Sequence, residues 1–467
     1  MEPTIETQVS DPGSLILRRL LIGGIGAVYA TLLLLTYQEL SKLWSYIGFW
    51  YRPPEPSVTA TTIVAAAALG FLLPVRSWTV VGFAKWILYF ILFIPALIIP
   101  PQQGVLVDDE LFLLCTLIWI SAAAMILFLR DGAPFRTIAV SETVLFQSVL
   151  AAWVLGNIAI IAVFGRSMSI VGLEQVYEQR SAVASLGGGA IGYVMGIMSG
   201  AVNPFLLVVG LSRKRPLFIA LALVGQILIY STLAGKVVLG STVLIIGTYM
   251  VFRGGKVAFS RIYAGLLTLA VLGPITTRPE LYTGGLAATF SDLVYMRILV
   301  LPGVLVGVYS EFFQRYPVTH LSHSLIGRPF FDYPYGNESV GQVIGRYVTP
   351  TLGDAVNNYN ANFIAADGIT GFGTWGIPLI FVLAAAWLWM TSKLVGTHNR
   401  RVVCAVLTPF VVSLADASLF TAILTGGGAF AALLLYLLRS SEQHGVSHNA
   451  LPSETSDDLV VAPKQGG

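Results

Sequence analysis

Residues 20–37, LLIGGIGAVYATLLLLTY, form an uncharged apolar run, and similar runs recur almost to Leu438. A bilayer core about 30 Å thick is crossed by roughly 20 apolar helical residues, and these runs are close to that length. Their apolar residues are consecutive and do not alternate with polar ones, which favours helices over the strands of a β-barrel. We therefore expect an all-α, polytopic integral membrane protein.

The composition supports this expectation. Hydrophobic residues make up 55% of the chain and charged residues 11%, whereas a soluble domain needs about a quarter of its residues charged. The net charge of +3 does not indicate a nucleic-acid partner, because the basic residues flank the apolar runs. Cys115 and Cys404 both fall inside such runs, so we expect neither a disulfide framework nor a cysteine metal cluster.

The apolar runs predict roughly 12–13 transmembrane or re-entrant helices. The first run has no clear cleavage site before a soluble domain, so we interpret it as a retained span rather than a signal peptide. Residues 1–439 are expected to form a single membrane domain, and the polar residues 440–467 a disordered tail. The predicted spans are residues 15–37, 58–74, 79–100, 111–129, 142–165, 190–211, 216–234, 237–252, 257–275, 291–312, 371–392, 402–420 and 421–438.

Basic residues in the short loops predict the orientation. Arg18, Arg76 and Arg130 all fall on one face of the membrane if the spans alternate, whereas loop 101–110 is acidic and has no basic residue. Because lysine and arginine mark cytoplasmic loops, the N-terminus is expected in the cytoplasm. The basic loop 393–401 places the C-terminus there as well.

Thirteen full spans cannot join two cytoplasmic termini, so one segment is re-entrant or misread. The strongest candidate is 291–312, which contains Arg297, Pro302 and Glu311. If it does not cross, loop 313–370 lies outside the cytoplasm. Broken membrane segments are tolerated where they line a protein cavity, so this anomaly is a first indication of a functional site.

Two loops, 166–189 and 313–370, are longer than most connections and are predicted on the periplasmic face. The second is rich in aromatic, asparagine and glycine residues, as in RPFFDYPYGNES (328–339). Aromatic faces and amide groups together suit sugar rings. Aromatic residues also collect at membrane interfaces as anchors, and both interpretations stay open for any single ring.

The familiar catalytic motifs are absent from the sequence: phosphate loop, nucleotide fold, GxSxG, HExxH, DxD and paired cysteines. We therefore expect no metal and no cofactor. Arg180 and Arg297 are candidate anion-binding residues, because a guanidinium presents a planar fork of donors to a phosphate. The alternatives are a solvated loop arginine for Arg180 and snorkelling to the interface for Arg297. Lys236 interrupts a long apolar stretch, and a tight outer turn explains it equally well.

His320 and His323 are candidate proton acceptors in THLSHS (319–324). They would share a face if this piece were helical, and histidine accepts protons near neutral pH. Two surface histidines at a membrane boundary are the alternative. The carboxylates near them in the sequence are more often solvated loop charges when taken singly: Glu311, Glu338, Asp354 and Asp367.

The stretch from Arg180 to Gly376 resembles the bacterial oligosaccharide repeat-unit polymerases, also called O-antigen or Wzy-type polymerases. The resemblance rests on the order and spacing of several pieces, and the residues before 170 match only as generic spans. The pieces are VYEQR (176–180) before a glycine-rich span start, STLAGK (231–236), YMRILVLPGVLVGVYSEFF (295–313), THLSHS (319–324) and NANFIAADGITGFGTWGIP (360–378).

This resemblance implies a metal-independent GT-C membrane glycosyltransferase of the bacterial inner membrane. Such enzymes use undecaprenyl-diphosphate-linked oligosaccharide on the periplasmic side. The growing chain moves from its lipid carrier onto the non-reducing end of the next lipid-linked unit, and the lipid diphosphate leaves. Besides this substrate and membrane lipid, the resemblance implies a chain-length regulator protein as a partner.

The resemblance also suggests roles for individual residues. Arg180 and Arg297 are candidate diphosphate binders, with Lys236 as a third. Preorganised cations of this kind stabilise the charge that develops on a leaving diphosphate.

An acceptor hydroxyl needs a base, and His323 is the first choice, with Asp367 and Glu338 as alternatives. The candidate glycan contacts are Asn360, Asn362 and His320.

Three other functions compete with polymerisation. An O-antigen ligase would share the diphosphate site but transfer glycan to lipid A core. A transporter of lipid-linked glycans predicts inverted repeats and midplane charges, and we find no convincing repeat. A membrane O-acyltransferase would need a histidine buried in a span, whereas all five histidines lie in loops or the tail.

Overall fold

The computed structural model describes residues 12–75, 79–168, 189–233, 236–252, 259–282, 285–350, 358–396 and 399–449. The structure is 79% helical, and its described residues form no strand. In this part of the chain, eight helices are long and apolar enough to cross a membrane. The prediction of an all-α, multi-pass membrane protein is therefore confirmed.

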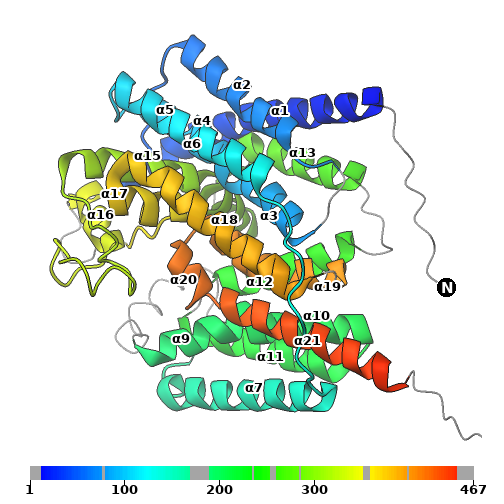
Figure 1. Cartoon of the computed structure of the whole chain (residues 1–467). Helices are drawn as coiled ribbons and strands as arrows, with labels where there is room; N and C mark the ends of the chain where they lie inside the picture. Colours follow the sequence, from blue (N-terminus) through cyan, green and yellow to red (C-terminus); the bar gives the residue numbers. More distant parts are fainter. Residues whose placement is uncertain are drawn as a thin grey trace, which may run out of the picture.

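The N-terminal helices pack into one group together with two helices from later in the chain (Figure 1). Helix α1 packs against α2 and α13, and α18 packs against α6. The interior of this group is built from large buried side chains such as Tyr29, Tyr89 and Phe93. The helices are α1 (Pro12–Trp44), α2 (Pro56–Leu72), the consecutive α3 (Val80–Leu88), η2 (Tyr89–Phe93), α4 (Ile94–Ile98) and α5 (Pro100–Gln103), α6 (Asp108–Phe128), α13 (Phe259–Thr276) and α18 (Gly376–Val395).

A second group packs beside the first around Phe205 and Ile245, both fully buried. Within it α10 packs on α11, and α12 on α19. The helices are α7 (Glu142–Phe164), the consecutive α9 (Ala190–Ile197), η3 (Met198–Val202) and α10 (Asn203–Arg213), then α11 (Pro216–Leu233), α12 (Lys236–Val251), α19 (Arg400–Ser413) and α21 (Gly428–Asn449).

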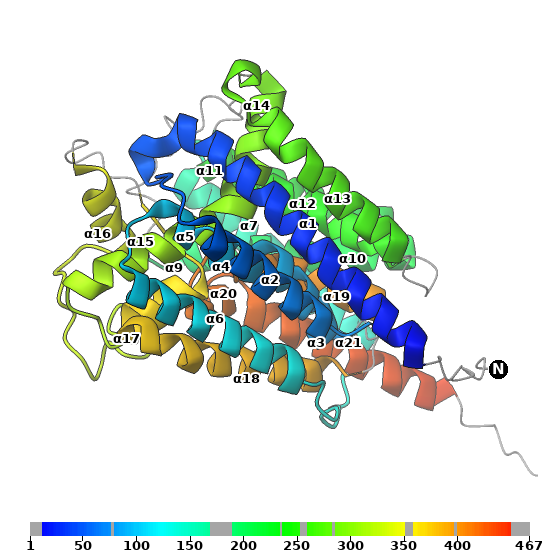
Figure 2. The same cartoon turned by 90° about the horizontal axis from the view of Figure 1, so that it is seen from above.

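Basic side chains gather at one end of the bundle, which we call the basic end. The Arg19 guanidinium lies over the Phe71 ring, at the start of α1 and the end of α2. Arg213, at the end of α10, forms ion pairs with Glu142 and Glu442. Figure 2 shows the start of α1 and the end of α21 at the same side. The opposite end carries the long loop after residue 315, and we call it the loop end.

The segment 291–312 belongs to a bent helix whose two ends both lie at the loop end. It comprises α14 (Gly285–Ser291), the π-helical η5 (Asp292–Val300) and α15 (Leu301–Arg315). Tyr282, just before it, packs edge-on against Trp44 at the end of α1. The Tyr295 hydroxyl donates to the Leu269 carbonyl in the middle of α13. Gly307 then abuts Gln103, where α5 ends.

The segment therefore enters the bundle and turns back, although its length and hydropathy would suffice for a crossing. A π-helical turn followed by Pro302 accounts for the bend. With both ends at the loop end, residues 313–350 and 358–361 lie at that same end.

The last two predicted spans need correction. Helix α19 ends at Ser413, before the predicted limit of 420, and is followed by a turn and by the short α20 (Leu419–Ile423). A second turn at Gly426 and Gly427 precedes α21. Polar and glycine residues interrupt the helix here, where hydropathy alone indicated continuous spans.

The predicted start of a disordered tail at residue 440 is also wrong for its first part. Helix α21 continues to Asn449. Glu442 pairs with Arg213, and the Gln443 amide oxygen accepts a hydrogen bond from the Thr137 hydroxyl. These contacts hold a polar helical turn that the composition did not reveal. Residues 450–467 lie outside the described part of the chain.

Candidate functional site

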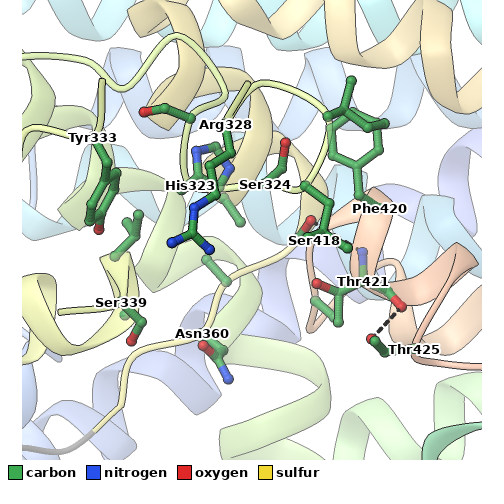
Figure 3. A pocket seen from close by; sticks show the side chains of 18 of the residues that line it. His323, Ser324, Arg328, Tyr333, Ser339, Asn360, Ser418, Phe420, Thr421 and Thr425 are labelled. Carbon is green, nitrogen blue, oxygen red and sulfur yellow. Dashed lines mark hydrogen bonds between the residues drawn. The ribbon is translucent and has the colours of Figure 1, made fainter. Parts of the chain in front are cut away.

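A cavity of about 560 Å³ lies at the loop end, between the loop after α15 and the turns around α20 (Figure 3). Its walls come from residues 322–328 and 333–341, from 360–361, and from α20. Tyr193 of α9 completes it on the side of the second helix group. Segments far apart in the sequence thus meet at one cavity with both polar and apolar walls.

The THLSHS piece that enters this cavity is not a helix. The backbone amides of Thr319 and His320 donate to the carbonyls of Thr370 and Gly371 at 2.8 and 3.0 Å. His320 and Leu321 both have positive φ, 50° and 64°. A Cβ on Gly371 would lie 2.9 Å from the Leu321 side chain, so the glycine makes this close approach possible.

The condition for a shared face, a helix over this piece, is therefore not met, and the two histidines have different environments. His323 lines the cavity. His320 is exposed, stacks on Phe331 with ring centroids 5.4 Å apart, and is not among the lining residues.

The His323 ring is held through its Nδ1 atom. Nδ1 lies 2.7 Å from the Thr319 hydroxyl oxygen, which lies 3.1 Å from the Thr370 carbonyl. A hydroxyl has one proton. If Thr319 donates it to Thr370, Nδ1–H donates to Thr319 and the Nε2 lone pair is free. This tautomer leaves Nε2 as the atom that accepts a further proton.

Nε2 faces Asp367. It lies 3.6 Å from the Asp367 Oδ1 atom, is covered, and has no hydrogen-bond partner among the described residues. The distance is too long for a hydrogen bond, so the carboxylate lies beside Nε2 without bonding to it. Because Nε2 is covered, proton transfer from a substrate requires the ring to turn toward the cavity.

Asp367 is fixed from α20. It lies in the π-helical η7 (Ile364–Ile369) and is 1% exposed. Its Oδ1 accepts from the Ser418 hydroxyl at 2.7 Å and its Oδ2 from the Leu419 amide at 2.6 Å. Buried carboxylates need such partners, so Asp367 ties α20 to the ring of His323.

Arg328 supplies a positive charge to the cavity. Its exposed guanidinium projects between Tyr333 and Ser324, beside His323 (Figure 3). Among the described residues it forms no ion pair, and it is the only lysine or arginine that lines the cavity. A free planar fork of donors in a hollow suits an anionic group such as a phosphate.

Glu338 lies on another wall and is paired with Arg346, which precedes the end of α16 (Val340–Val348). The Tyr333 hydroxyl donates to the Glu338 carbonyl at 2.7 Å. Burial, with added repulsion from Tyr335 and Glu338, raises the pKa of Tyr333 to about 12. Tyr333 therefore stays protonated and acts as a hydrogen-bond donor at neutral pH.

The two predicted asparagines have different environments. Asn360 lines the cavity. Asn362 is fully buried, its amide donates to the Pro302 carbonyl at 2.9 Å, and its oxygen accepts from the amides of Ile364 and Ala365. Asn362 therefore caps the π-helical segment, and its predicted role as a glycan contact is wrong for this structure.

Of the three predicted cations, only Arg297 has a side chain in the described part of the structure. Arg297 lies in η5, is not among the lining residues, and interacts electrostatically with Asp416. Lys236 begins α12, but its side chain lies outside the described part of the structure. Arg180 lies in 169–188, also outside the described residues.

Sequence reasoning missed several residues of the site. Arg328 stands in the aromatic stretch 328–339, where its charge was the only signal. Ser418 accepts a hydrogen bond from the Thr421 amide and caps α20, and a serine before an apolar turn is a recognisable signal for this. Thr421 and Thr425 line the cavity on the same side.

No family model, curated protein or solved structure matches this chain. The site is therefore interpreted from its own geometry. Within the described ranges, no group of three or more histidine, cysteine, aspartate or glutamate side chains is arranged to hold a metal ion. The site combines a histidine backed by a buried carboxylate, an unpaired guanidinium, and hydroxyl and amide groups.

Proposed function

We propose that this protein is a metal-independent membrane glycosyltransferase that polymerises undecaprenyl-diphosphate-linked oligosaccharide repeat units into a surface polysaccharide. One observation carries the proposal: His323 and the Arg328 guanidinium line one cavity at the loop end, with the Asp367 carboxylate directly behind His323. The pair supplies a proton acceptor, and the guanidinium supplies a site for an anionic leaving group.

The proposed step is a displacement at the anomeric carbon. A hydroxyl of the acceptor repeat unit attacks this carbon and forms the new glycosidic bond. The bond between the anomeric carbon and the diphosphate oxygen breaks, and its electron pair leaves with the lipid diphosphate. The hydroxyl proton passes to Nε2 of His323. Negative charge grows on the diphosphate, where Arg328 stabilises it more in the transition state than in the substrate.

His323 is the proposed base, and Asp367 is its positioning residue. The ring turns toward the cavity to take the proton, and the negative charge of the neighbouring carboxylate favours the imidazolium when the ring turns back to face it. Glu338 also lines the cavity, but its carboxylate is engaged in an ion pair with Arg346. Asn360 and Tyr333 are proposed hydrogen-bond partners for sugar hydroxyls.

The diphosphate binders predicted from the sequence are revised in this proposal. Arg328 becomes the first proposed diphosphate binder, because its guanidinium enters the cavity that His323 lines. Arg297 is not a proposed binder in the cavity; it interacts electrostatically with Asp416, which precedes the lining residues Ala417 and Ser418. Arg180 and Lys236 remain proposed binders from the sequence resemblance.

The proposed location is a bacterial inner membrane, with the basic end in the cytoplasm and the loop end in the periplasm. Support comes from the gathering of Arg19, Arg213 and Lys393 at the basic end, since cytoplasmic loops are enriched in basic residues. Both termini are then cytoplasmic. A chain-length regulator protein is a proposed partner at the periplasmic face.

The test is transfer by the purified protein in vitro. Protein in lipid nanodiscs is mixed with a lipid-diphosphate-linked repeat unit from the source strain, with and without lipid A core. A ladder of lipid-linked oligomers without the core supports the polymerase. Transfer only to lipid A core identifies a ligase instead. Absence of any transfer by folded protein and verified substrate contradicts both transferase functions.

A further inference from the structure

Four large apolar side chains are exposed together on the loop next to the cavity. Leu325 is 61% exposed, Ile326 51%, Phe330 77% and Phe331 49%. Single exposed apolar residues are ordinary, but a contiguous group marks an interaction surface. We call these four residues the apolar lip.

The apolar lip is held in a defined conformation. The backbone amides of Phe330 and Phe331 donate to the Gly327 carbonyl at 2.9 and 3.1 Å. The Gly327 amide donates to the Ser324 hydroxyl, and a Cβ on Gly327 would come within 2.3 Å of the Leu321 carbonyl oxygen. The turn is therefore tight and depends on the glycine, and it presents the four side chains outward.

The apolar lip adjoins a membrane-spanning helix. The His320 ring stacks on Phe331 and meets the edge of Phe372 with centroids 5.9 Å apart. Phe372 and Trp375, which are 37% and 68% exposed, lie just before α18, in the N-terminal half of the candidate span Ile364–Val395. The lip thus continues the apolar surface of a span that faces lipid, and aromatic residues at a span end are typical of the headgroup region.

The apolar lip is also one edge of the cavity. Leu325 and Ile326 line it, and Arg328, the next residue but one, extends into it. At a membrane surface, apolar side chains can enter the layer of acyl chains, and an arginine beside them can bind the phosphates of the headgroup layer. The opposite wall is polar, with Asn337 and Ser339.

We propose that the apolar lip is embedded in the bilayer at the loop end, so that the cavity opens sideways at the level of the lipid headgroups. The occupant of this surface is the lipid bilayer itself, because the surface is continuous with that of a membrane span. The inference depends on the membrane spans and not on the proposed glycosyl transfer. If that transfer is also correct, a lipid-linked substrate reaches Arg328 without its tail leaving the bilayer.

The test measures the depth of single nitroxide labels in phosphatidylcholine–phosphatidylglycerol vesicles. The label is placed at Phe330→Cys, and at Leu325→Cys in a second variant, in a chain carrying Cys115→Ala and Cys404→Ala. Power saturation compares collisions with oxygen, which concentrates in lipid, and with a water-soluble nickel chelate. Val382→Cys, on the 64% exposed lipid side of α18, is the lipid reference, and Asn337→Cys is the aqueous reference.

The proposal predicts an oxygen-to-nickel collision ratio at both lip positions that is severalfold above that of Asn337→Cys and close to that of Val382→Cys. A ratio equal to that of Asn337→Cys places the lip in water and overturns the proposal. Labels shielded from both reagents mean that the lip is covered by protein, which overturns it as well. Each labelled variant is first checked for a monodisperse elution profile, so that misfolded protein is not scored.

Discussion

The imidazole Nε2 atom of His323 faces the carboxylate of Asp367 at 3.6 Å, so the beginning and the end of the segment 313–370 lie side by side. The carboxylate is itself fixed by two donors from the turn before α20. The buried Asp367 carboxylate thus connects α20, which forms one wall of the cavity, to the ring of His323.

Asp367→Asn should lower the rate of glycosyl transfer by at least about 100-fold, because general-base assistance is worth roughly 10²–10⁴. The amide keeps the shape of the side chain but does not stabilise a positive His323. The rate is measured on the purified variant. The exposed Asp332 is the matched control, and Asp332→Asn should keep the wild-type rate. Equal rates for the two variants would remove Asp367 from the mechanism.

Arg328→Lys should slow transfer roughly tenfold to a hundredfold, because a lysine keeps the charge but loses the planar fork of donors. The control is Arg315→Lys, at an exposed arginine paired with Glu311 outside the cavity. Rates and substrate affinities are compared for both. If Arg328→Lys transfers as fast as Arg315→Lys, Arg328 does not hold the diphosphate.

Gly196→Ala should destabilise the protein by about 1–3 kcal/mol through overpacking. A Cβ there would come 1.7 Å from the Thr425 carbonyl oxygen, at the turn beside the cavity. At Gly24 no atom lies within 4 Å of the added Cβ, and Gly24→Ala should gain up to about 1 kcal/mol from helix propensity. Thermal unfolding in detergent measures both. A Gly196→Ala protein as stable as Gly24→Ala would contradict the packing of α9 on this turn.

Cysteine labelling should show the loop end outside the cytoplasm. In a chain with Cys115 and Cys404 replaced, Asn337→Cys should react with an impermeant maleimide applied to spheroplasts. Ala133→Cys, exposed at the basic end, should react only after permeabilisation. The reverse pattern would invert the proposed orientation.

Transfer should persist after treatment with a strong chelator, because guanidinium groups supply the positive charge in the proposed mechanism. Activity is measured before and after dialysis against the chelator. Loss of activity that a divalent cation restores would contradict the metal-independent step.

Hydropathy was sufficient to predict the class of fold, since lipid-facing helices need long apolar runs whatever their tertiary contacts. The bend of residues 291–312 left a trace in the sequence, through Arg297, Pro302 and the parity of the spans. The ends of α19 and α21 left a weaker trace. They depend on the Ser418 cap, the Gly426–Gly427 turn and the Glu442–Arg213 pair, and these are local or tertiary contacts that hydropathy does not register.

The site was predicted in part. His323, Glu338 and Asn360 do line one cavity, with Asp367 directly behind it. Asn362 was misassigned because its side chain hydrogen-bonds to the backbone amides of Ile364 and Ala365 and caps the helix. Only the backbone geometry reveals this.

Arg328 was missed for the converse reason. Its position in the loop has no motif, and only folding carries it beside His323.

The most direct measurement of the central claim is the stoichiometry of transfer. Purified protein would be incubated with a radiolabelled lipid-diphosphate-linked repeat unit, and the glycosidic bonds formed would be counted from the oligomer ladder. The released lipid diphosphate would be counted in the same samples. The proposed mechanism predicts one lipid diphosphate released for each bond formed, with both quantities falling together in Asp367→Asn. Folded wild-type protein that forms no bond, or that moves the intact lipid-linked unit without releasing its diphosphate, would contradict it.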